Sequence, residues 1–384
     1  MKKKEKEQKR GFTTREVAIL MVAMLLVGIM VGSISSYAIK GTIIYNKYST
    51  DYEEIIETYQ NIKSEYYNDI DNKNLLDAAV KGMIESLDDE YSNFLDKSDT
   101  ENLDKSLQDK YIGIGCGILA KDNRFYVEEV YKETPAYEKL KKGDEITKID
   151  DKSIKGMTLS EVCDLIAGRE NTKVKITILR DKKEETYTLK RSKIDNPTVS
   201  SDKKNNVGII TITSFTESTK KQFERELKEL EKENIKGLII DVRDNIGGYI
   251  SSAGDIASMF LKKGTTLYQL EKKNFTSKVK DETKENRNIK VAVLINGSTA
   301  SSAEVLASTL KEQYNATLIG EKTYGKGSVQ KVVKLSSGAS YKVTIEKWKT
   351  AKGKTVEKKG LTPDITVSND KEDRQLEKAL QIFK

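Results

Sequence analysis

The sequence predicts an α/β protein that carries a separate β-rich unit, and three observations support this fold class. Two stretches, 237–261 and 291–314, share one layout: an apolar strand, a glycine-containing loop, and a helix with apolar residues at three- and four-residue steps. Two such units in one chain are typical of a parallel sheet covered by helices. Residues 107–194 instead show short apolar runs bounded by turns, which predicts strands.

Composition limits the classes of function. The 384 residues are long enough for two or three domains. Charged residues make up 33% of the chain with a net charge of +7, but acidic and basic residues are interspersed and no aromatic-interleaved basic motif occurs, so we expect no nucleic-acid partner. Cys116 and Cys163 have no metal-binding spacing, and the chain has no histidine, so no metal site is expected. We expect two buried free thiols, while a disulfide between them stays open.

The N-terminus has the pattern of a membrane anchor. Residues 1–16 are rich in lysine and form a basic tail, and Val17–Ile39 contains no charge. A span of about twenty apolar residues matches the hydrocarbon thickness of a bilayer. We therefore expect a single-pass anchor at the cell membrane, with a cytoplasmic N-terminus and the main body outside the cytoplasm. A cleaved signal peptide is the alternative, and it also exports the main body.

Residues 40–106 are expected to form a helical N-terminal segment. One apolar face recurs at three- and four-residue steps, at Leu75, Leu76, Ala79, Val80, Met83, Ile84 and Leu87. This face either pairs with a second copy of the chain, which would make a homodimer, or packs on the main domain.

The unit at 107–194 resembles a PDZ domain. It opens with YIGIG and continues with KKGDEITKIDD, a predicted turn and strand, MTLSEVCDLIAG, a predicted helix, and VKITILR, another strand. The resemblance implies that a protein's C-terminal tail adds as a strand beside the helix and that loop amides hold its carboxylate. The implied peptide-binding residues are Tyr111, Ile112, Gly113, Ile114 and Gly115, with Leu165 and Ile166 beside the groove.

Residues 195–384 carry the predicted α/β core. Pro197 and the polar run 200–206 mark its boundary, and a strand and an amphipathic helix, Thr219 to Glu233, follow. Residues 262–287 are highly charged and are expected to be a surface excursion. A hairpin is predicted around residues 336–338, and an amphipathic tail closes the chain. In a parallel sheet, the loops after the strands meet at the carboxyl edge.

A serine and a lysine in these loops indicate nucleophilic chemistry. Ser301 lies at a predicted helix start, where unpaired N–H groups favour negative charge, and Lys326 lies between two glycines. Because the chain has no histidine, a Ser-His-Asp triad is excluded, and a lysine or a carboxylate must take the proton. A lysine base requires burial or positive neighbours that disfavour the ammonium form.

Taken in order, the motifs resemble the C-terminal processing, or tail-specific, peptidases, which are Ser-Lys serine peptidases with a PDZ domain. The resemblance runs from about Tyr59 to the end of the chain. It rests on the PDZ unit and on SLDDEYSNFL, IIDVRDNIGG, NGSTASSAEV, IGEKTYGKGSVQ and KKGLTPDITV. It implies a peptidase core built of crotonase/Clp-like βα units. The chain departs from the family pattern in the STASSAE run, at Ile246, where proline is common, and at Thr350-Ala351, where the family has Thr-Pro.

The resemblance also implies roles for individual residues. Ser298, Ser301 and Ser302 are candidate nucleophiles, and matching the motif outward from Asn296 and Glu304 favours Ser301. Lys326 is then the base and Gln330 the residue that orients it. The amides of Gly247 and Ser302 would form the oxyanion hole. Arg169 matches a position that couples peptide binding to the active arrangement.

These inferences predict a membrane-anchored serine endopeptidase that holds protein tails in its PDZ domain and cleaves with a Ser-Lys dyad. No metal or organic cofactor is implied. A catalytically inactive PDZ scaffold is one alternative, and acyl transfer on a small ester or thioester is another.

Overall fold

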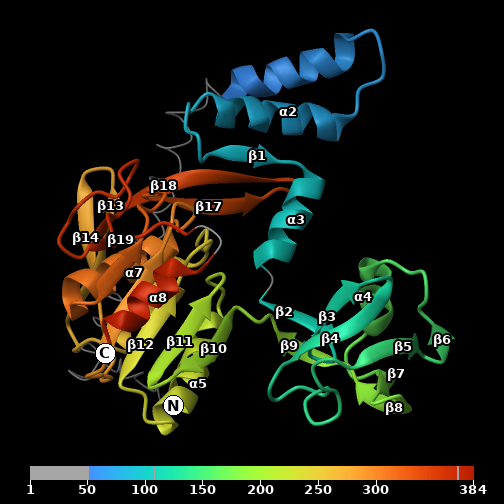
Figure 1. Ribbon diagram of the computed structural model, residues 1–384. Helices are drawn as coiled ribbons and strands as arrows, with labels where there is room; N and C mark the ends of the chain where they lie inside the picture. The colour runs from blue at the N-terminus through green and yellow to red at the C-terminus, as the bar shows by residue number, and fades with distance from the viewer. Residues whose placement is uncertain (1–51, 108, 370–371) are drawn as a thin grey trace, which may run out of the picture. The chain divides into compact units, whose positions relative to one another are not determined.

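The computed structural model describes residues 52–107, 109–369 and 372–384 (Figure 1). The chain divides into two compact units, residues 1–78 and 79–384. The predicted basic tail and the predicted anchor, Val17–Ile39, lie outside the described residues. Among the residues that are described, no helix combines the length and the apolar character that crossing a membrane requires.

The segment expected to be helical also contains a strand. Residues 52–65 are helical, and α2 (Asn72–Glu85) and α3 (Lys97–Leu107) follow. Between these two helices, β1 (Asn93–Leu95) pairs antiparallel with β18 (Ser340–Thr350). A three-residue strand is too short to show an alternating pattern, so its sequence gave no signal. On the predicted apolar face Leu76, Met83 and Leu87 are exposed.

The β-rich unit has the predicted strands and helix. Its elements are β2 (Lys110–Gly113), β3 (Cys116–Lys121), β4 (Arg124–Val130), β5 (Glu145–Ile149), β6 (Lys152–Ser153), α4 (Leu159–Ile166), β7 (Lys173–Arg180), β8 (Lys183–Lys190) and β9 (Ser192–Asp195). The main sheet has the order β3-β4-β5-β7-β8, with β6 on β5, while β2 pairs with β9. Helix α4 starts at a capping box between Thr158 and Glu161 and packs Val162 and Ile166 on the sheet.

The second half of the chain contains a six-stranded sheet in the order β10-β11-β12-β15-β16-β19. Its strands are β10 (Val199–Lys204), β11 (Val207–Ile212), β12 (Gly237–Asp241), β15 (Lys290–Ile295), β16 (Thr317–Gly320) and β19 (Ile365–Thr366). All neighbours are parallel except β10 and β11. The helices are α5 (Thr219–Lys232), α6 (Ile250–Ser258), α7 (Ser302–Tyr314) and α8 (Arg374–Gln381). The predicted parallel α/β core is therefore confirmed.

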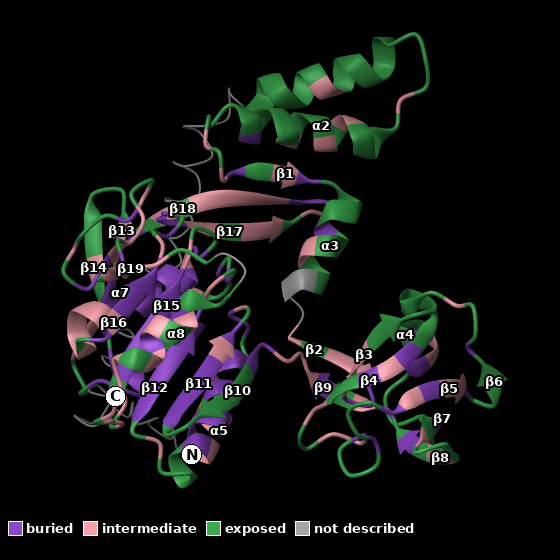
Figure 2. Cartoon of the chain, in the orientation of Figure 1, coloured by how far each residue is buried: buried purple, intermediate pink, exposed green. Residues whose placement is uncertain are grey.

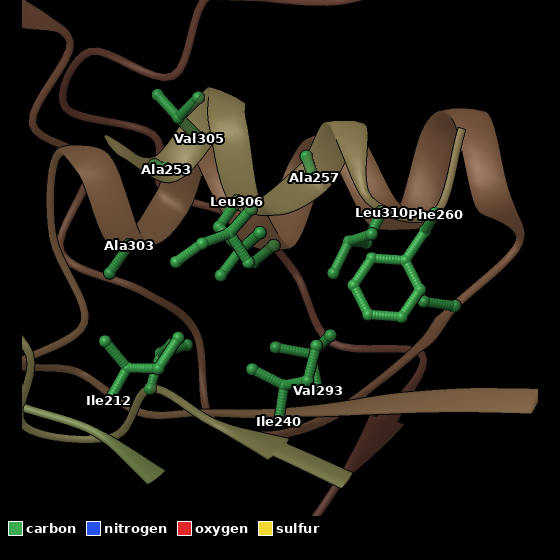
Figure 3. Close-up of a cluster of buried hydrophobic side chains, with 14 of the residues drawn as sticks. Ile212, Ile240, Ala253, Ala257, Phe260, Val293, Ala303, Val305, Leu306 and Leu310 are labelled. Carbon is green, nitrogen blue, oxygen red and sulfur yellow. The ribbon is translucent and has the colours of Figure 1, made fainter. Parts of the chain in front are cut away.

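Helices cover both faces of this sheet, which explains its uninterrupted apolar strands (Figure 2). On one face, Leu306 and Leu310 of α7 lie over Ile240 and Val293 of the central strands (Figure 3). On the other face, Ala379 of α8 packs in a second cluster with strand residues whose side chains point to that face, Ile239, Ala292, Leu294 and Ile319. The sheet is thus a rigid base for the loops at its carboxyl edge.

A second sheet corrects one expectation. Residues 262–287, expected to be a surface excursion, contain a hairpin of β13 (Thr266–Lys272) and β14 (Phe275–Lys280). Strand β13 pairs with β18 and buries Leu267 and Tyr268 in the core, so the hairpin is part of the packed domain. The predicted hairpin around residues 336–338 is confirmed as β17 (Ser328–Lys334) and β18.

Candidate active site

The loops that follow β12 and β15 are hydrogen-bonded to each other, as the parallel sheet predicts. The Ala300 amide donates to the Asn245 carbonyl at 2.9 Å. The Asn296 side chain donates to Asp244 at 2.8 Å and accepts from the Asp244 amide at 3.0 Å. These bonds hold the Asn245–Gly248 loop against the turn that carries the candidate serines.

The three candidate serines have different environments. Ser298 is exposed in the turn, and the Ser302 side chain is buried with its hydroxyl donating to the Gly248 carbonyl at 2.8 Å. Ser301 is half-buried and has a φ of 55° and a ψ of −119°, an unfavourable backbone conformation for a residue with a Cβ. Such a conformation costs about 1–3 kcal/mol. Many hydrolases present a nucleophilic serine in a strained strand-to-helix turn, and among the three candidates only Ser301 has a positive φ.

A buried carboxylate links the Ser301 turn to the Lys326 loop. The side chain of Glu304 is fully buried, and its Oε2 accepts the amides of Ser301 and Lys326, both at 2.9 Å. Its Oε1 accepts the Gly325 amide at 2.9 Å and the Thr323 hydroxyl at 2.5 Å. Burial raises the pKa of Glu304, and the four donors oppose that rise. In the sequence, Glu304 is one of the residues from which the motif is matched and stands at the capping-box spacing from Ser301, and neither feature indicates the link to a second loop.

The surroundings of Lys326 favour a neutral amine. Burial lowers the pKa of Lys326 below its ordinary value of 10.5, the positive charge of Lys342 lowers it further, and Glu357 opposes both. Its backbone is held as well, because the indole N–H of Trp348 donates to the Lys326 carbonyl at 2.8 Å. The amine lies 5.4 Å from the centre of the Tyr91 ring. Burial and a positive neighbour are what a lysine base requires, whereas the Tyr91 ring, at cation–π distance, stabilises the charged form.

The SLDDEYSNFL segment supplies Tyr91, a contact that sequence reasoning did not identify. The Ser92 hydroxyl accepts the Thr344 amide of β18 at 3.0 Å, so the segment is fixed beside the β17–β18 hairpin. No pattern within this motif connects the tyrosine ring to Lys326.

Gln330 does not share a strand with Lys326. The strand β17 begins at Ser328, after Lys326, and its pairing with β18 is shifted by a bulge between Val329 and Gln330. The side-chain amide of Gln330 donates to the Ser328 hydroxyl at 2.7 Å. Strand alternation therefore does not relate the directions of the Lys326 and Gln330 side chains, because alternation applies only within a regular strand.

Gly247 lies directly against the serine turn. Its φ is +108°, and a Cβ at this position would be 2.8 Å from the Ser301 Cβ and 3.2 Å from the Ser302 nitrogen. The Gly247 amide donates to the Asn245 side-chain oxygen at 2.8 Å. Ser302 is the first residue of α7, where an amide has no partner within the helix. The two residues whose amides are predicted to form the oxyanion hole thus lie beside Ser301.

The predicted peptide-binding residues occupy the β-rich unit as follows. Tyr111 and Ile112 are half-buried, and Gly113, Ile114 and Gly115 are buried. Leu165 is half-buried, but Ile166 is only 6% exposed and packs in the core of the unit. Ile166 therefore supports α4 from beneath, because it shares the core face with Val162 one turn earlier.

Arg169 follows α4 and is exposed, and its carbonyl accepts the Thr172 amide and hydroxyl. The structure thus brings together Ser301, Ser302, Gly247 and, through Glu304, the Lys326 loop.

The parallel core, the strained serine turn and the β-rich unit define a serine-type peptidase with a peptide-binding domain. Residues 206–367 match peptidase family S41, residues 126–180 match the PDZ domain, and residues 33–99 match the N-terminal domain of the activating protease CtpB.

Related proteins agree with these matches. The chain is 39% identical over 318 residues to the carboxy-terminal processing protease CtpA of Bacillus subtilis, covering 82% of this chain and 68% of that protein. It is 34% identical to a probable CtpA-like serine protease of Staphylococcus aureus, covering 83% of this chain and 65% of the relative. Among solved structures, the photosystem II D1 C-terminal processing protease aligns with a TM-score of 0.52 and 25% identity, covering 88% of this chain and 92% of that one. The chain belongs to the serine-type C-terminal processing proteases of peptidase family S41.

Proposed function

We propose that this chain is a membrane-anchored endopeptidase that holds a protein by its C-terminal tail and cleaves it with Ser301 and Lys326. One observation carries the proposal: the amides of Ser301 and Lys326 share one oxygen of the buried Glu304. This shared acceptor fixes the two loops relative to each other, and burial lowers the pKa of Lys326 in the same site.

The reaction follows from these groups. The Ser301 hydroxyl attacks the scissile carbonyl carbon while the neutral Lys326 amine takes the hydroxyl proton. The resulting oxyanion accepts hydrogen bonds from the amides of Ser302 and Gly247. Because the Gly247 amide bonds to Asn245 in this structure, the oxyanion must replace the Asn245 oxygen as its acceptor. When the tetrahedral intermediate collapses, Lys326 gives the proton to the leaving amine. Water then hydrolyses the acyl-enzyme.

Gln330 is proposed to orient the Lys326 amine. Its N–H group donates to Ser328, which leaves the side-chain carbonyl oxygen of Gln330 as an acceptor for an amine. When the Gln330 oxygen accepts an N–H of the Lys326 amine, the nitrogen lone pair of that amine points away from Gln330. The lone pair is then free to face the serine proton.

Substrate recognition is proposed to lie in the PDZ domain. The segment from Tyr111 to Gly115 precedes β3 and is a loop only after Gly113, because its first three residues belong to β2, which pairs with β9; α4 packs on the same unit. A tail that adds as a strand beside β3, with its carboxylate on the loop amides, uses main-chain bonds for affinity. Arg169 would connect an occupied groove to the active arrangement.

The remaining organisation is proposed from the sequence. Val17–Ile39 would be the anchor after a cytoplasmic tail at 1–16, with the catalytic region outside the cytoplasm. The segment 40–106, the PDZ domain at 107–194 and the core at 195–384 would then follow the anchor. The exposed side chains of Leu76, Met83 and Leu87 favour a homodimer through the N-terminal segment.

The decisive comparison uses one unfolded substrate with and without its last few residues. A tail-specific peptidase cleaves the intact substrate and loses rate on the truncated one. A scaffold binds the intact substrate without cleaving it, and an enzyme acting on small esters neither binds nor cleaves it. Cleavage of both substrates at equal rates would contradict recognition through the tail.

A further inference from the structure

The two cysteines of the chain lie in β3 and α4, the two elements that would form the walls of the proposed peptide groove. Cys116 is the first residue of β3 and Cys163 lies in α4, and both are free thiols. Cα atoms of β3 and α4 approach within 8 Å of each other. Cys116 packs against the cluster that contains Val162 and Ile166 of α4. The expectation of two buried thiols is wrong for Cys163, which is exposed.

Cys163 belongs to the side of α4 that does not face the core. Val162 and Ile166 are buried in the unit, whereas Leu159, one turn before Cys163, is 38% exposed. The strand β3 ends the order β3-β4-β5-β7-β8 of the main sheet, so it is the edge strand of that sheet. An edge strand is where an extended peptide is added.

The directions of the pKa shifts agree with the contact between β3 and α4. Burial, and then Cys163, raises the pKa of the Cys116 thiol to about 12. Burial also raises the pKa of the Tyr111 hydroxyl, and Cys116 and Cys163 both add to that rise. The pKa of the exposed Cys163 thiol is raised as well, by partial desolvation and by the negative charge of Asp164. Because the pKa values of both thiols are raised, their thiolates are minor species at neutral pH, and exchange with an oxidant is expected to be faster at higher pH.

We propose that Cys116 and Cys163 form a reversible disulfide across the groove, and that this bond excludes protein tails from the PDZ domain. A tail added to β3 needs a strip about 4.8 Å wide beside that strand. A disulfide instead holds the two Cα atoms about 5.5–6 Å apart, which leaves no room for a chain between the strand and the helix. The inference rests on the proposed tail recognition and adds a thiol site that controls it.

The oxidant required is a low-molecular-weight disulfide. The Cys163 thiolate attacks one of its sulfur atoms and releases one thiolate, which leaves a mixed disulfide on Cys163. The Cys116 thiolate then attacks the Cys163 sulfur and releases the second thiolate. Both cysteines are oxidised, the oxidant is reduced to two thiols, and the two cysteine protons pass to solvent.

The test uses the full chain with oxidised glutathione as the probe. Non-reducing peptide mapping reads the linkage, and fluorescence polarisation of a short labelled peptide with an apolar C-terminal residue and a free carboxylate reads tail binding. We expect a Cys116–Cys163 link, a Kd that rises at least about tenfold, and full recovery with dithiothreitol. The exposed position of Cys163 makes Cys163→Ser a mild change, and this variant should bind the tail equally well with and without the oxidant.

Three results would overturn the inference. They are a glutathione adduct on Cys163 with Cys116 still reduced, a disulfide between two chains, and the expected link with an unchanged Kd. A reduced chain that does not bind the tail refutes tail recognition itself and removes the basis of this inference. The peptide map shows whether the Cys116–Cys163 disulfide forms even when the chain does not bind the tail. It therefore separates a failure of tail recognition from a failure of the disulfide inference.

Discussion

The amide of Lys326 donates to the Oε2 of Glu304 at 2.9 Å, and this oxygen also accepts the amide of Ser301 at 2.9 Å. One buried side chain thus sets the relative position of two loops that are far apart in sequence. Activity should therefore depend on Glu304 even though the proposed mechanism gives it no proton to transfer.

Glu304→Gln should lower kcat by about 10²-fold, because small displacements of reacting groups cost rates of that order. The amide replaces one acceptor oxygen with a donor that faces N–H groups. Kinetics with an unfolded tail substrate measure the loss, and KM should change much less than kcat.

The matched control is Glu312→Gln on the same helix. The Glu312 carboxylate accepts the Lys352 amide at 2.8 Å and the Thr350 hydroxyl at 3.0 Å, so it links α7 to the end of β18 and not to the Lys326 loop. Its variant should keep kcat within a few-fold. Equal losses in both variants would show that Glu304 acts only through the stability of α7.

The pH dependence of cleavage should report the charges around Lys326. The base must be neutral, so the rate rises with pH through the pKa of Lys326, which burial and Lys342 lower below 10.5. Removing a positive neighbour raises that pKa, so Lys342→Gln should move the rising limb to higher pH. Removing the negative Glu357 lowers it, so Glu357→Gln should move the limb to lower pH.

The pH profile of kcat/KM measures both shifts. Lys331→Gln, an exposed lysine of β17, is the control and should leave the profile in place. Shifts of the same sign in the Lys342 and Glu357 variants would rule out Lys326 as the titrating base.

Sequence reasoning located the elements of the site better than its contacts. The apolar run before Asn296 and the helical spacing after Ser302 predicted a strand, a turn and a helix, which the structure confirms as β15 and α7. The lack of histidine predicted that a lysine or a carboxylate takes the serine proton. Periodicity could not reveal the hydrogen bonds of Glu304, because they join residues of different elements and depend on how the loops pack.

Two other differences between the sequence predictions and the structure also come from contacts between elements. The β-bulge at Gln330 breaks the alternation that sequence spacing assumes, and no residue in β17 signals it. The high charge of residues 262–287 predicts a surface excursion, whereas the structure pairs β13 of this segment with β18. In each case tertiary pairing decides a conformation that the local composition leaves open.

Gly247→Ala should reduce activity by more than its loss of stability explains. The residue has a φ of +108°, and the added Cβ would be 2.8 Å from the Ser301 Cβ. We expect kcat to fall at least about tenfold, because the loop must move away from the proposed oxyanion. Kinetics together with the unfolding midpoint measure the two effects.

Gly264→Ala separates backbone strain from crowding. Gly264 has a φ of +89° with open space around its Cβ position, so alanine there meets similar strain without a clash. It should lower stability by about 1 kcal/mol and leave kcat unchanged. A similar kcat in both variants would contradict the role of the Gly247 amide.

The most direct test of the account compares cleavage of one tail-bearing substrate by Ser298→Ala, Ser301→Ala and the unchanged chain. Ser301→Ala removes only the hydroxyl oxygen of a half-buried side chain, so its unfolding midpoint should match that of the unchanged protein. The account predicts no cleavage by Ser301→Ala and full cleavage by Ser298→Ala. Undiminished cleavage by folded Ser301→Ala would contradict it.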